Sequence, residues 1–219
     1  MYIIFDMDGV IIDSEKLYLK SYFHAAEVHN LPKEVMDDVA VKCTGVNEEM
    51  EKDLLVSAFG DLPGFNYEEV FATTRKYFNN AITNGKIDLK AGVKEILDFL
   101  EERGIKKGLA SSSPMDIIKR ELGAHQILDY FDVIVSGDMV EKSKPDPDIF
   151  FACASLMGIK AEEYKETYVV EDSYNGVRAA YNAGMIPIMI PDVLPPTEEM
   201  EEIACRILPS LKDLTGLPW

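Results

Sequence analysis

Short apolar runs alternate with amphipathic stretches along most of this chain. The runs are of strand length, most are rich in Ile or Val, and polar residues do not interrupt them, which is typical of parallel strands buried on both faces of a sheet. Between the later runs, apolar residues recur at helical spacing, as at Val93, Ile96, Leu97 and Leu100 before Gly104. This alternation predicts right-handed crossovers and a doubly wound, Rossmann-like α/β fold with a parallel sheet. Strands are expected at residues 2–5, 105–110, 133–135, 168–170 and 186–190, and further helices at 116–122, 148–157 and 172–182.

One interval, from residue 14 to about residue 84, breaks this alternation. It contains no convincing strand, and its apolar residues form three helical stripes within residues 18–26, 50–55 and 70–82. We therefore expect an all-helical domain inserted directly after the first strand. The predicted domains are an α/β core made of residues 1–13 and 87–219, and a helical domain made of residues 14–86.

The charge of the chain limits its partners. Its 219 residues carry a net charge of −17, and such a field repels nucleic-acid phosphates and anionic lipid. No apolar run approaches the length of a membrane-spanning helix, and the N-terminus lacks a basic region followed by an apolar stretch. We therefore expect a cytoplasmic protein that binds neither nucleic acid nor membrane, with no protein partner evident. A phosphorylated substrate would need cations gathered locally.

Side chains with reactive or metal-binding chemistry lie just past the ends of several expected strands. In an open α/β sheet, the carboxyl ends of the strands gather the residues that bind ligands. The common placement of these side chains therefore predicts one site at that edge. They are Asp6 and Asp8, Ser111, Lys144, and Glu171 with Asp172.

Each of these motifs also has a purely structural explanation. A turn explains one carboxylate and the glycine of the motif that begins at Asp6, and a helix cap explains the serine run at Ser111. A proline-rich loop before a helix explains Lys144, and an acidic helix N-terminus explains Glu171 with Asp172. Considered one at a time, the motifs leave both interpretations open, and their shared position in the sheet favours a functional one.

The order of the motifs resembles the haloacid dehalogenase-like superfamily. D-x-D-G-V begins at Asp6, a serine follows the second strand at Ser111, K-P-x-P begins at Lys144, and E-D-S-x-x-G begins at Glu171. The helical insertion lies where that superfamily carries its first type of cap, and the resemblance covers essentially the whole chain. The resemblance implies an α/β catalytic core with a helical cap domain.

The resemblance also implies a role for each motif. Asp6 would be the nucleophile that accepts the phosphoryl group, and Asp8 the general acid and base. Ser111 would donate a hydrogen bond to the phosphate, with Ser112 supporting it through its backbone. Lys144 would balance the charge of Asp6 and of the phosphoryl group.

The implied cofactor is Mg²⁺. In the superfamily pattern its ligands would be the carboxylate of Asp6, the carbonyl of Asp8 and the carboxylate of Asp172, with Glu171 binding directly or through water. The chemistry agrees, because Mg²⁺ prefers oxygen ligands and usually takes one or two carboxylates plus waters and substrate oxygens.

The expected function is magnesium-dependent hydrolysis of a small phosphomonoester, a sugar phosphate or similar metabolite, through an aspartyl-phosphate on Asp6. One alternative is a β-phosphoglucomutase-type mutase. Counted without gaps, the cap histidine and cap arginine of such mutases fall on Tyr18 and Glu48, which favours hydrolysis. A second alternative is a non-catalytic phospho-acceptor module, against which the long helical insertion and the second carboxylate, Asp8, both argue. The cap residues expected to meet the substrate are Tyr18, Lys42 and Gly45.

Overall fold

The structure of the protein, a computed structural model, describes residues 1–43, 48–84 and 87–217. Contacts between Cα atoms divide the chain into two compact units. The first, called the α/β unit, comprises Met1–Asp13 and Asp88–Trp219. The second, called the helical unit, comprises Ser14–Ile87.

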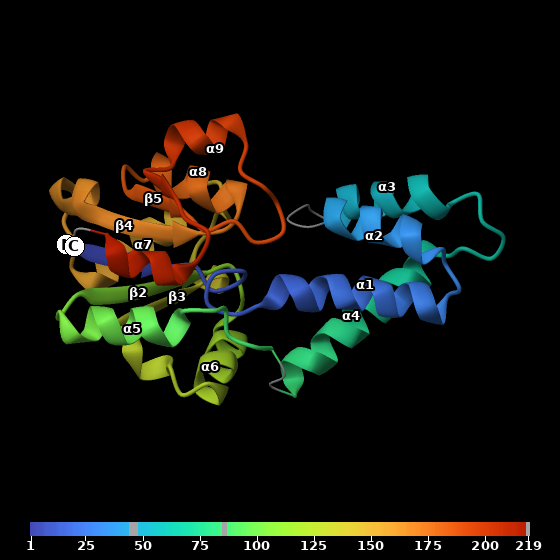
Figure 1. The fold of residues 1–219 in the computed structure, drawn as a ribbon, viewed down its shortest axis with the longest axis horizontal. Helices are drawn as coiled ribbons and strands as arrows, with labels where there is room; N and C mark the ends of the chain where they lie inside the picture. The colour runs from blue at the N-terminus through green and yellow to red at the C-terminus, as the bar shows by residue number, and fades with distance from the viewer. Residues whose placement is uncertain (44–47, 85–86, 218–219) are drawn as a thin grey trace. The chain divides into compact units, whose positions relative to one another are not determined.

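Among the described residues of the α/β unit, six parallel strands form one sheet in the order β3-β2-β1-β4-β5-β6 (Figure 1). The strands are β1 (Tyr2–Phe5), β2 (Lys106–Ser111), β3 (Val133–Ser136), β4 (Thr167–Glu171), β5 (Ile186–Met189) and β6 (Arg206–Ile207). Phe5 pairs with Leu109 on one side and Val170 on the other, so the three central strands end at the same edge. The order of the strands reverses at β1, and such a reversal opens the crevice in which α/β sheets bind ligands.

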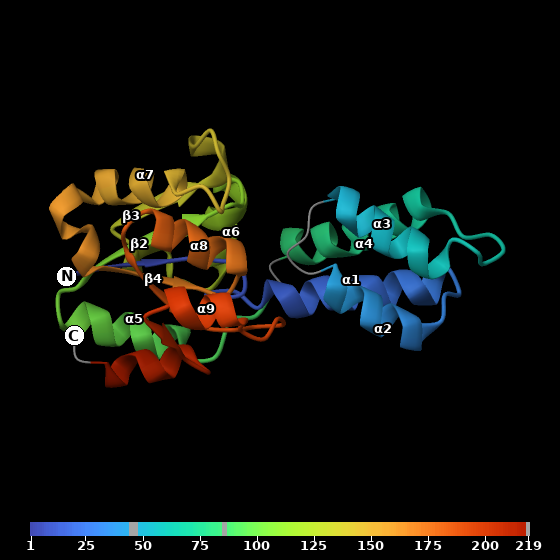
Figure 2. The ribbon, with the colours of Figure 1, turned by 90° about the horizontal axis from the view of Figure 1, so that it is seen from above.

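Helices cover both faces of this sheet, and the predicted doubly wound α/β class is confirmed. They are α5 (Val93–Glu102), α6 (Met115–Ala124), α7 (Asp148–Met157), α8 (Tyr174–Asn182) and α9 (Glu198–Ile203), with short 3-10 segments η1 (Leu128–Tyr130), η2 (Gly137–Met139), η3 (Ala161–Glu166) and η4 (Leu211–Gly216). In Figure 2, α7 and α5 lie on opposite faces of the sheet. Helices α7 and α8 share one buried apolar cluster with strand residues such as Ile4, Ala110 and Val169.

The helical unit contains four helices in its described residues: α1 (Ser14–Val28), α2 (Lys33–Lys42), α3 (Glu48–Phe59) and α4 (Tyr67–Thr83). Side chains of all four contribute to one buried cluster, among them Tyr22, Met36, Leu55 and Val70. Asn66 caps α4 by accepting a hydrogen bond from the backbone of Glu68, as expected of a residue with a short polar side chain.

Several details differ from the sequence-based expectations. Strand β6 and helix α9 were not predicted, because a strand of two residues and a helix of six are too short to show periodicity. Helix α2 was not predicted. Met50, which was assigned to the apolar stripe at residues 50–55, is exposed. Helix α8 begins at Tyr174 instead of residue 172, because Ser173 caps it. None of the helices in the described part of the chain combines the length and apolar character needed to span a bilayer.

Candidate active site

Three segments that are far apart in the sequence meet at the carboxyl edge of the sheet. Asp6 directly follows β1, Glu171 ends β4, and Lys144 lies in the loop between η2 and α7. The ammonium Nζ of Lys144 lies 2.5 Å from Asp6 Oδ1 and 2.6 Å from Glu171 Oε1. It also donates to the carbonyl oxygen of Ala110 at 3.3 Å. Lys144 therefore bridges the two carboxylates, as a charge-balancing lysine must.

All three charged groups are buried, and burial changes their protonation. Asp6 is 6% exposed and Glu171 fully buried. Burial raises the pKa of the Asp6 carboxyl to about 8; the ammonium of Lys144 opposes this shift, whereas the charges of Glu171 and Asp8 add to it. Burial disfavours the charged form of Lys144, but Asp6 and Glu171 outweigh burial and raise its pKa. The lysine is therefore held as a cation in a site that carries surplus negative charge.

Asp8 lies next to two serine hydroxyls, one from the last residue of β2 and one from the loop that follows. Its Oδ2 accepts hydrogen bonds from Ser113 Oγ at 2.9 Å and from Ser111 Oγ at 3.3 Å. The hydroxyl oxygen of Ser111 in turn accepts a hydrogen bond from the backbone N–H of Ser113 at 3.0 Å. These contacts orient the Asp8 carboxylate toward Ser111 and Ser113.

The acidic residues at this edge fit a divalent cation. One carboxylate oxygen from each of Asp6, Glu171 and Asp172 lies within 4.8 Å of the other two. Two of these side chains are buried and the third is partly buried, whereas Lys144 supplies one positive charge. Buried carboxylates are costly unless a cation compensates them, and hard divalent cations bind oxygen ligands. These three residues could therefore hold a metal ion, and they are among those for which the sequence predicts a magnesium site.

The hydrogen bonds of Glu171 distinguish its position from that of Asp172. Glu171 Oε1 is bound by Lys144, and Oε2 accepts from the hydroxyl of Ser173 at 3.0 Å. Both carboxylate oxygens of Glu171 therefore already accept hydrogen bonds from protein donors.

At two positions of the motifs, the backbone lies so close to these carboxylates that only glycine fits. Gly9 has φ +76°, and a Cβ built there would lie 2.0 Å from Oδ2 of Asp172. A Cβ on Gly176 would lie 1.9 Å from the carboxyl carbon of Glu171. Any side chain at either position would displace a carboxylate of the cluster, so the glycines of D-x-D-G and E-D-S-x-x-G shape the metal-binding edge.

Two serines for which the sequence predicts no role also contact the site. Ser113 donates to Asp8, and Ser173 both donates to Glu171 and accepts from the backbone of Gly176 as the cap of α8. Serines at helix starts are common caps, so sequence pattern alone did not separate these two from their neighbours. Ser112, predicted to support the phosphate, is exposed. Its carbonyl oxygen approaches Gly137 so closely that a Cβ built on Gly137 would lie 2.3 Å from it.

The predicted cap residues have contacts of their own within the helical unit. Tyr18 donates to Glu51 Oε2 at 3.2 Å and accepts from the hydroxyl of Tyr22 at 3.0 Å. Lys42 lies at the exposed end of α2, where its ammonium is 3.6 Å from Asp38. Gly45, the third predicted cap residue, lies outside the described residues.

Comparison with known proteins agrees with this geometry. The sequence profile of the haloacid dehalogenase-like hydrolases matches residues 3–190, which include every motif of the site. The chain therefore belongs to the haloacid dehalogenase-like hydrolase family, and it is an enzyme of the phosphatase type.

Two curated relatives and one solved structure illustrate the likeness. A phosphorylated carbohydrates phosphatase of Thermotoga maritima is 33% identical over 84% of this chain and 81% of its own length. A pyrophosphatase of Halalkalibacterium halodurans is 27% identical over 98% of this chain and 96% of its own. A crystal structure from Thermotoga maritima, provisionally described as a beta-phosphoglucomutase, is 27% identical and covers 99% of this chain and 97% of its own, with a TM-score of 0.77.

Proposed function

We propose that the chain is a magnesium-dependent phosphatase that hydrolyses small phosphomonoesters, with sugar phosphates as the first substrate class. The α/β unit would be the catalytic domain and the helical unit the cap. The observation that carries the proposal is the buried bridge from Lys144 to Asp6 and Glu171, beside Asp172. A stable fold does not need such a cluster, because apolar residues of similar volume stabilise a core as well or better.

Asp6 is the proposed nucleophile. Lys144 holds its Oδ1, whereas Oδ2 forms no hydrogen bond with any residue that the structure describes. An oxygen of Asp6 would attack phosphorus while the bond from phosphorus to the ester oxygen breaks. Lys144 balances the charge that builds on the transferred group, which is the main demand of phosphoryl transfer.

Asp8 is the proposed acid and base. It would give a proton to the departing ester oxygen and later accept one from the water that attacks the aspartyl-phosphate. That second attack breaks the bond between phosphorus and Asp6 and releases inorganic phosphate. Ser111 and Ser113 hold Asp8 by its Oδ2, so the carboxyl group is oriented before substrate binds.

Asp6 and Asp172 would hold Mg²⁺ directly, with the backbone carbonyl of Asp8 as a further contact. A bound Mg²⁺ supplies charge that neutralises phosphate oxygens. Glu171 would complete the site through its hydrogen bonds to Lys144 and Ser173.

A sugar phosphate as substrate is supported by the relative from Thermotoga maritima whose name describes a phosphatase of phosphorylated carbohydrates. The similarity to a structure described as a beta-phosphoglucomutase supports a mutase as the second candidate. Tyr18 argues for hydrolysis, because its hydroxyl is already bonded to Glu51 and Tyr22. Burial also raises its pKa, so this side chain stays neutral where a mutase histidine could carry charge.

The test separates hydrolase, mutase and phospho-acceptor. The enzyme with Mg²⁺ is incubated with a panel of sugar phosphates, including β-glucose 1-phosphate with and without glucose 1,6-bisphosphate. We expect many turnovers of phosphate release and no appreciable isomerised sugar. Glucose 6-phosphate formed faster than phosphate would establish the mutase, and one phosphate transferred per chain without release would establish the phospho-acceptor.

A further inference from the structure

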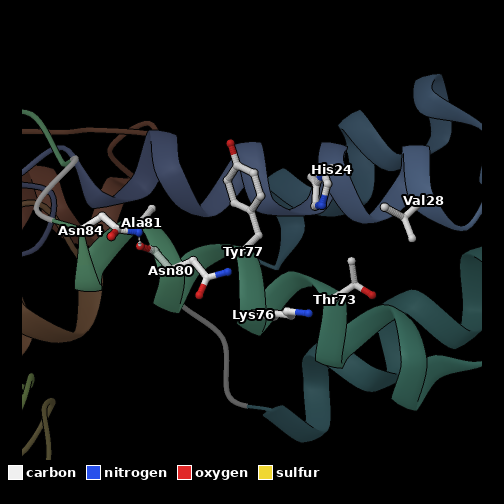
Figure 3. Close-up of a pocket in the computed structure, with 8 residues that line it drawn as sticks. All are labelled: His24, Val28, Thr73, Lys76, Tyr77, Asn80, Ala81 and Asn84. Carbon is white, nitrogen blue, oxygen red and sulfur yellow. Dashed lines mark hydrogen bonds between the residues drawn. The ribbon is translucent and has the colours of Figure 1, made fainter.

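A groove of about 500 Å³ lies between α1 and α4, wholly within the helical unit. We call it the accessory groove (Figure 3). Helix α1 lines it with His24 and Val28, which are one turn apart. Helix α4 and its C-cap line it with residues at the spacing of one helix face, chiefly Thr73, Lys76, Tyr77, Asn80 and Asn84.

The charge of the accessory groove is opposite to that of the chain. Lys76 is its permanent charge, and none of its lining residues is acidic, although the chain has 39 acidic and 22 basic residues. Beyond Glu68 and Glu69 in its first turn, α4 carries Arg75 and Lys76 and no carboxylate. Lys76 forms no ion pair with any residue that the structure describes. Lys76 is exposed, so water solvates this cation in the free protein, and the groove offers it to an anionic ligand.

The groove also offers hydrogen-bonding groups beside this cation. The side-chain amide of Asn80 is exposed and makes no hydrogen bond with the described residues. Asn80 lies four residues after Lys76, so both project from the same face of α4 (Figure 3). An amide offers both a donor and an acceptor, which suits the hydroxyl groups of a sugar or polyol.

Two rings form the apolar part of the groove. The rings of Tyr77 and His24 have their centroids 4.8 Å apart, with a tilt of 34° between their planes. Figure 3 shows them side by side above Lys76 and Asn80. Both residues are partly buried, so the rings present a firm surface against which the carbon skeleton of a small ligand can pack.

We propose that the accessory groove is a second binding site, separate from the acidic cluster of the α/β unit, for a sugar or polyol that carries a phosphate group. Lys76 binds the phosphate, Asn80 bonds the hydroxyls, and the two rings contact the carbon skeleton. Its lining residues include no carboxylate to act as nucleophile or metal ligand, so the groove binds this ligand without converting it.

The experiment measures binding by amide chemical shifts of ¹⁵N-labelled Asp6→Asn protein, which cannot turn the probe over. Glucose 6-phosphate is expected to shift the amides of residues 24 and 76–80 in a saturable way. Lys76→Gln should weaken this binding about tenfold, the loss typical of one charge-assisted hydrogen bond. The affinity reported by the amides of Ser111 and Lys144 should stay unchanged. The control at Ser111 and Lys144 rests on the proposed function, but the shifts at residues 24 and 76–80 are expected whether or not the active site binds or hydrolyses the probe.

Arg75→Gln is the matched control. It removes one positive charge from the adjacent position of the same helix, where Arg75 packs over the ring of Phe71 and does not line the groove. We expect less than about twofold weakening, with glucose and inorganic phosphate each binding at least about tenfold more weakly than glucose 6-phosphate. No saturable shift at residues 24 and 76–80, equal losses in the two variants, or inorganic phosphate binding as tightly as glucose 6-phosphate would each overturn the proposal.

Discussion

Each unit of the molecule buries carboxylates, but the two units compensate them differently. In the α/β unit, Asp6 and Glu171 share the ammonium of Lys144 at 2.5 and 2.6 Å. In the helical unit, Glu51 is 2% exposed, and its Oε2 accepts a hydrogen bond from the neutral hydroxyl of Tyr18. The first cluster brings opposite charges together, whereas the second relies on a neutral donor.

We expect this difference to distinguish a reaction centre from a structural cluster. A cation that bridges two carboxylates concentrates charge at one point, where a phosphoryl group and a metal can use it. The Glu51 carboxylate instead accepts from the hydroxyl of Tyr18, which accepts from that of Tyr22, and Cys43 lies close to this network. Burial, aided by the nearby Glu51 charge, raises the pKa of the Cys43 thiol to about 11. This network is therefore neutral apart from its one carboxyl group.

The largest expected effect tests the α/β cluster as a reaction centre. Asp6→Asn removes the attacking oxygen and a metal ligand, so turnover should fall by at least about 10⁴-fold, as when a nucleophile is removed from other hydrolases. The free energy of unfolding should stay close to that of the wild type, because Lys144 keeps its bond to Glu171. Phosphate release and circular dichroism measure the two effects.

Metal removal is the control for this variant. EDTA should abolish turnover of the wild type, and added Mg²⁺ should restore it, while Asp6→Asn stays inactive with Mg²⁺ in excess. An Asp6→Asn protein that keeps more than a few per cent of wild-type turnover, a loss of less than about thirtyfold, would contradict a covalent mechanism on Asp6.

The next effect tests charge compensation in the same cluster. Lys144→Met leaves two buried carboxylates without their cation and should lower the free energy of unfolding by about 3–5 kcal/mol. Lys107→Met is the matched control, because the Lys107 side chain is also buried (3% exposed against 8% for Lys144) but pairs with Glu101, whose side chain is 65% exposed. Water can solvate the carboxylate left behind there, so the loss should be about 1 kcal/mol or less.

Urea unfolding without metal measures both lysine variants. Mg²⁺ should stabilise Lys144→Met more than the wild type, because the cation then compensates charge that Lys144 no longer balances. Equal losses for the two variants would mean that the bridge at Asp6 contributes no more than an ordinary ion pair.

The smallest effect tests the helical cluster. Glu51→Gln keeps an acceptor for Tyr18 but removes a buried charge, so the free energy of unfolding should rise by about 1 kcal/mol. Tyr18→Phe keeps the charge and removes its donor, so stability should fall by about 1–3 kcal/mol. Thermal unfolding of both variants checks these opposite signs. If Glu51→Gln instead lowers the free energy of unfolding, the Glu51 carboxylate is compensated to the same degree as the carboxylates of the α/β unit.

The sequence by itself determined the class of fold and the edge that carries the chemistry. Runs of Ile and Val without polar alternation predicted buried parallel strands, and four motifs in order predicted that Asp6, Ser111, Lys144 and Glu171 converge. These features are local, because strand length, turn residues and spacing along the chain can be read without knowing which segments pack together.

Only the tertiary structure decided which partners each of these residues meets. Three contacts of the site depend on long-range packing. Lys144 binds Glu171 as well as Asp6. Ser113 contacts Asp8, and Gly176 leaves room for Glu171. The accessory groove also depends on the tertiary structure, since His24 and Tyr77 meet only when α1 packs on α4. Such contacts depend on packing between elements that are distant in the chain, which the spacing of residues along one element does not encode.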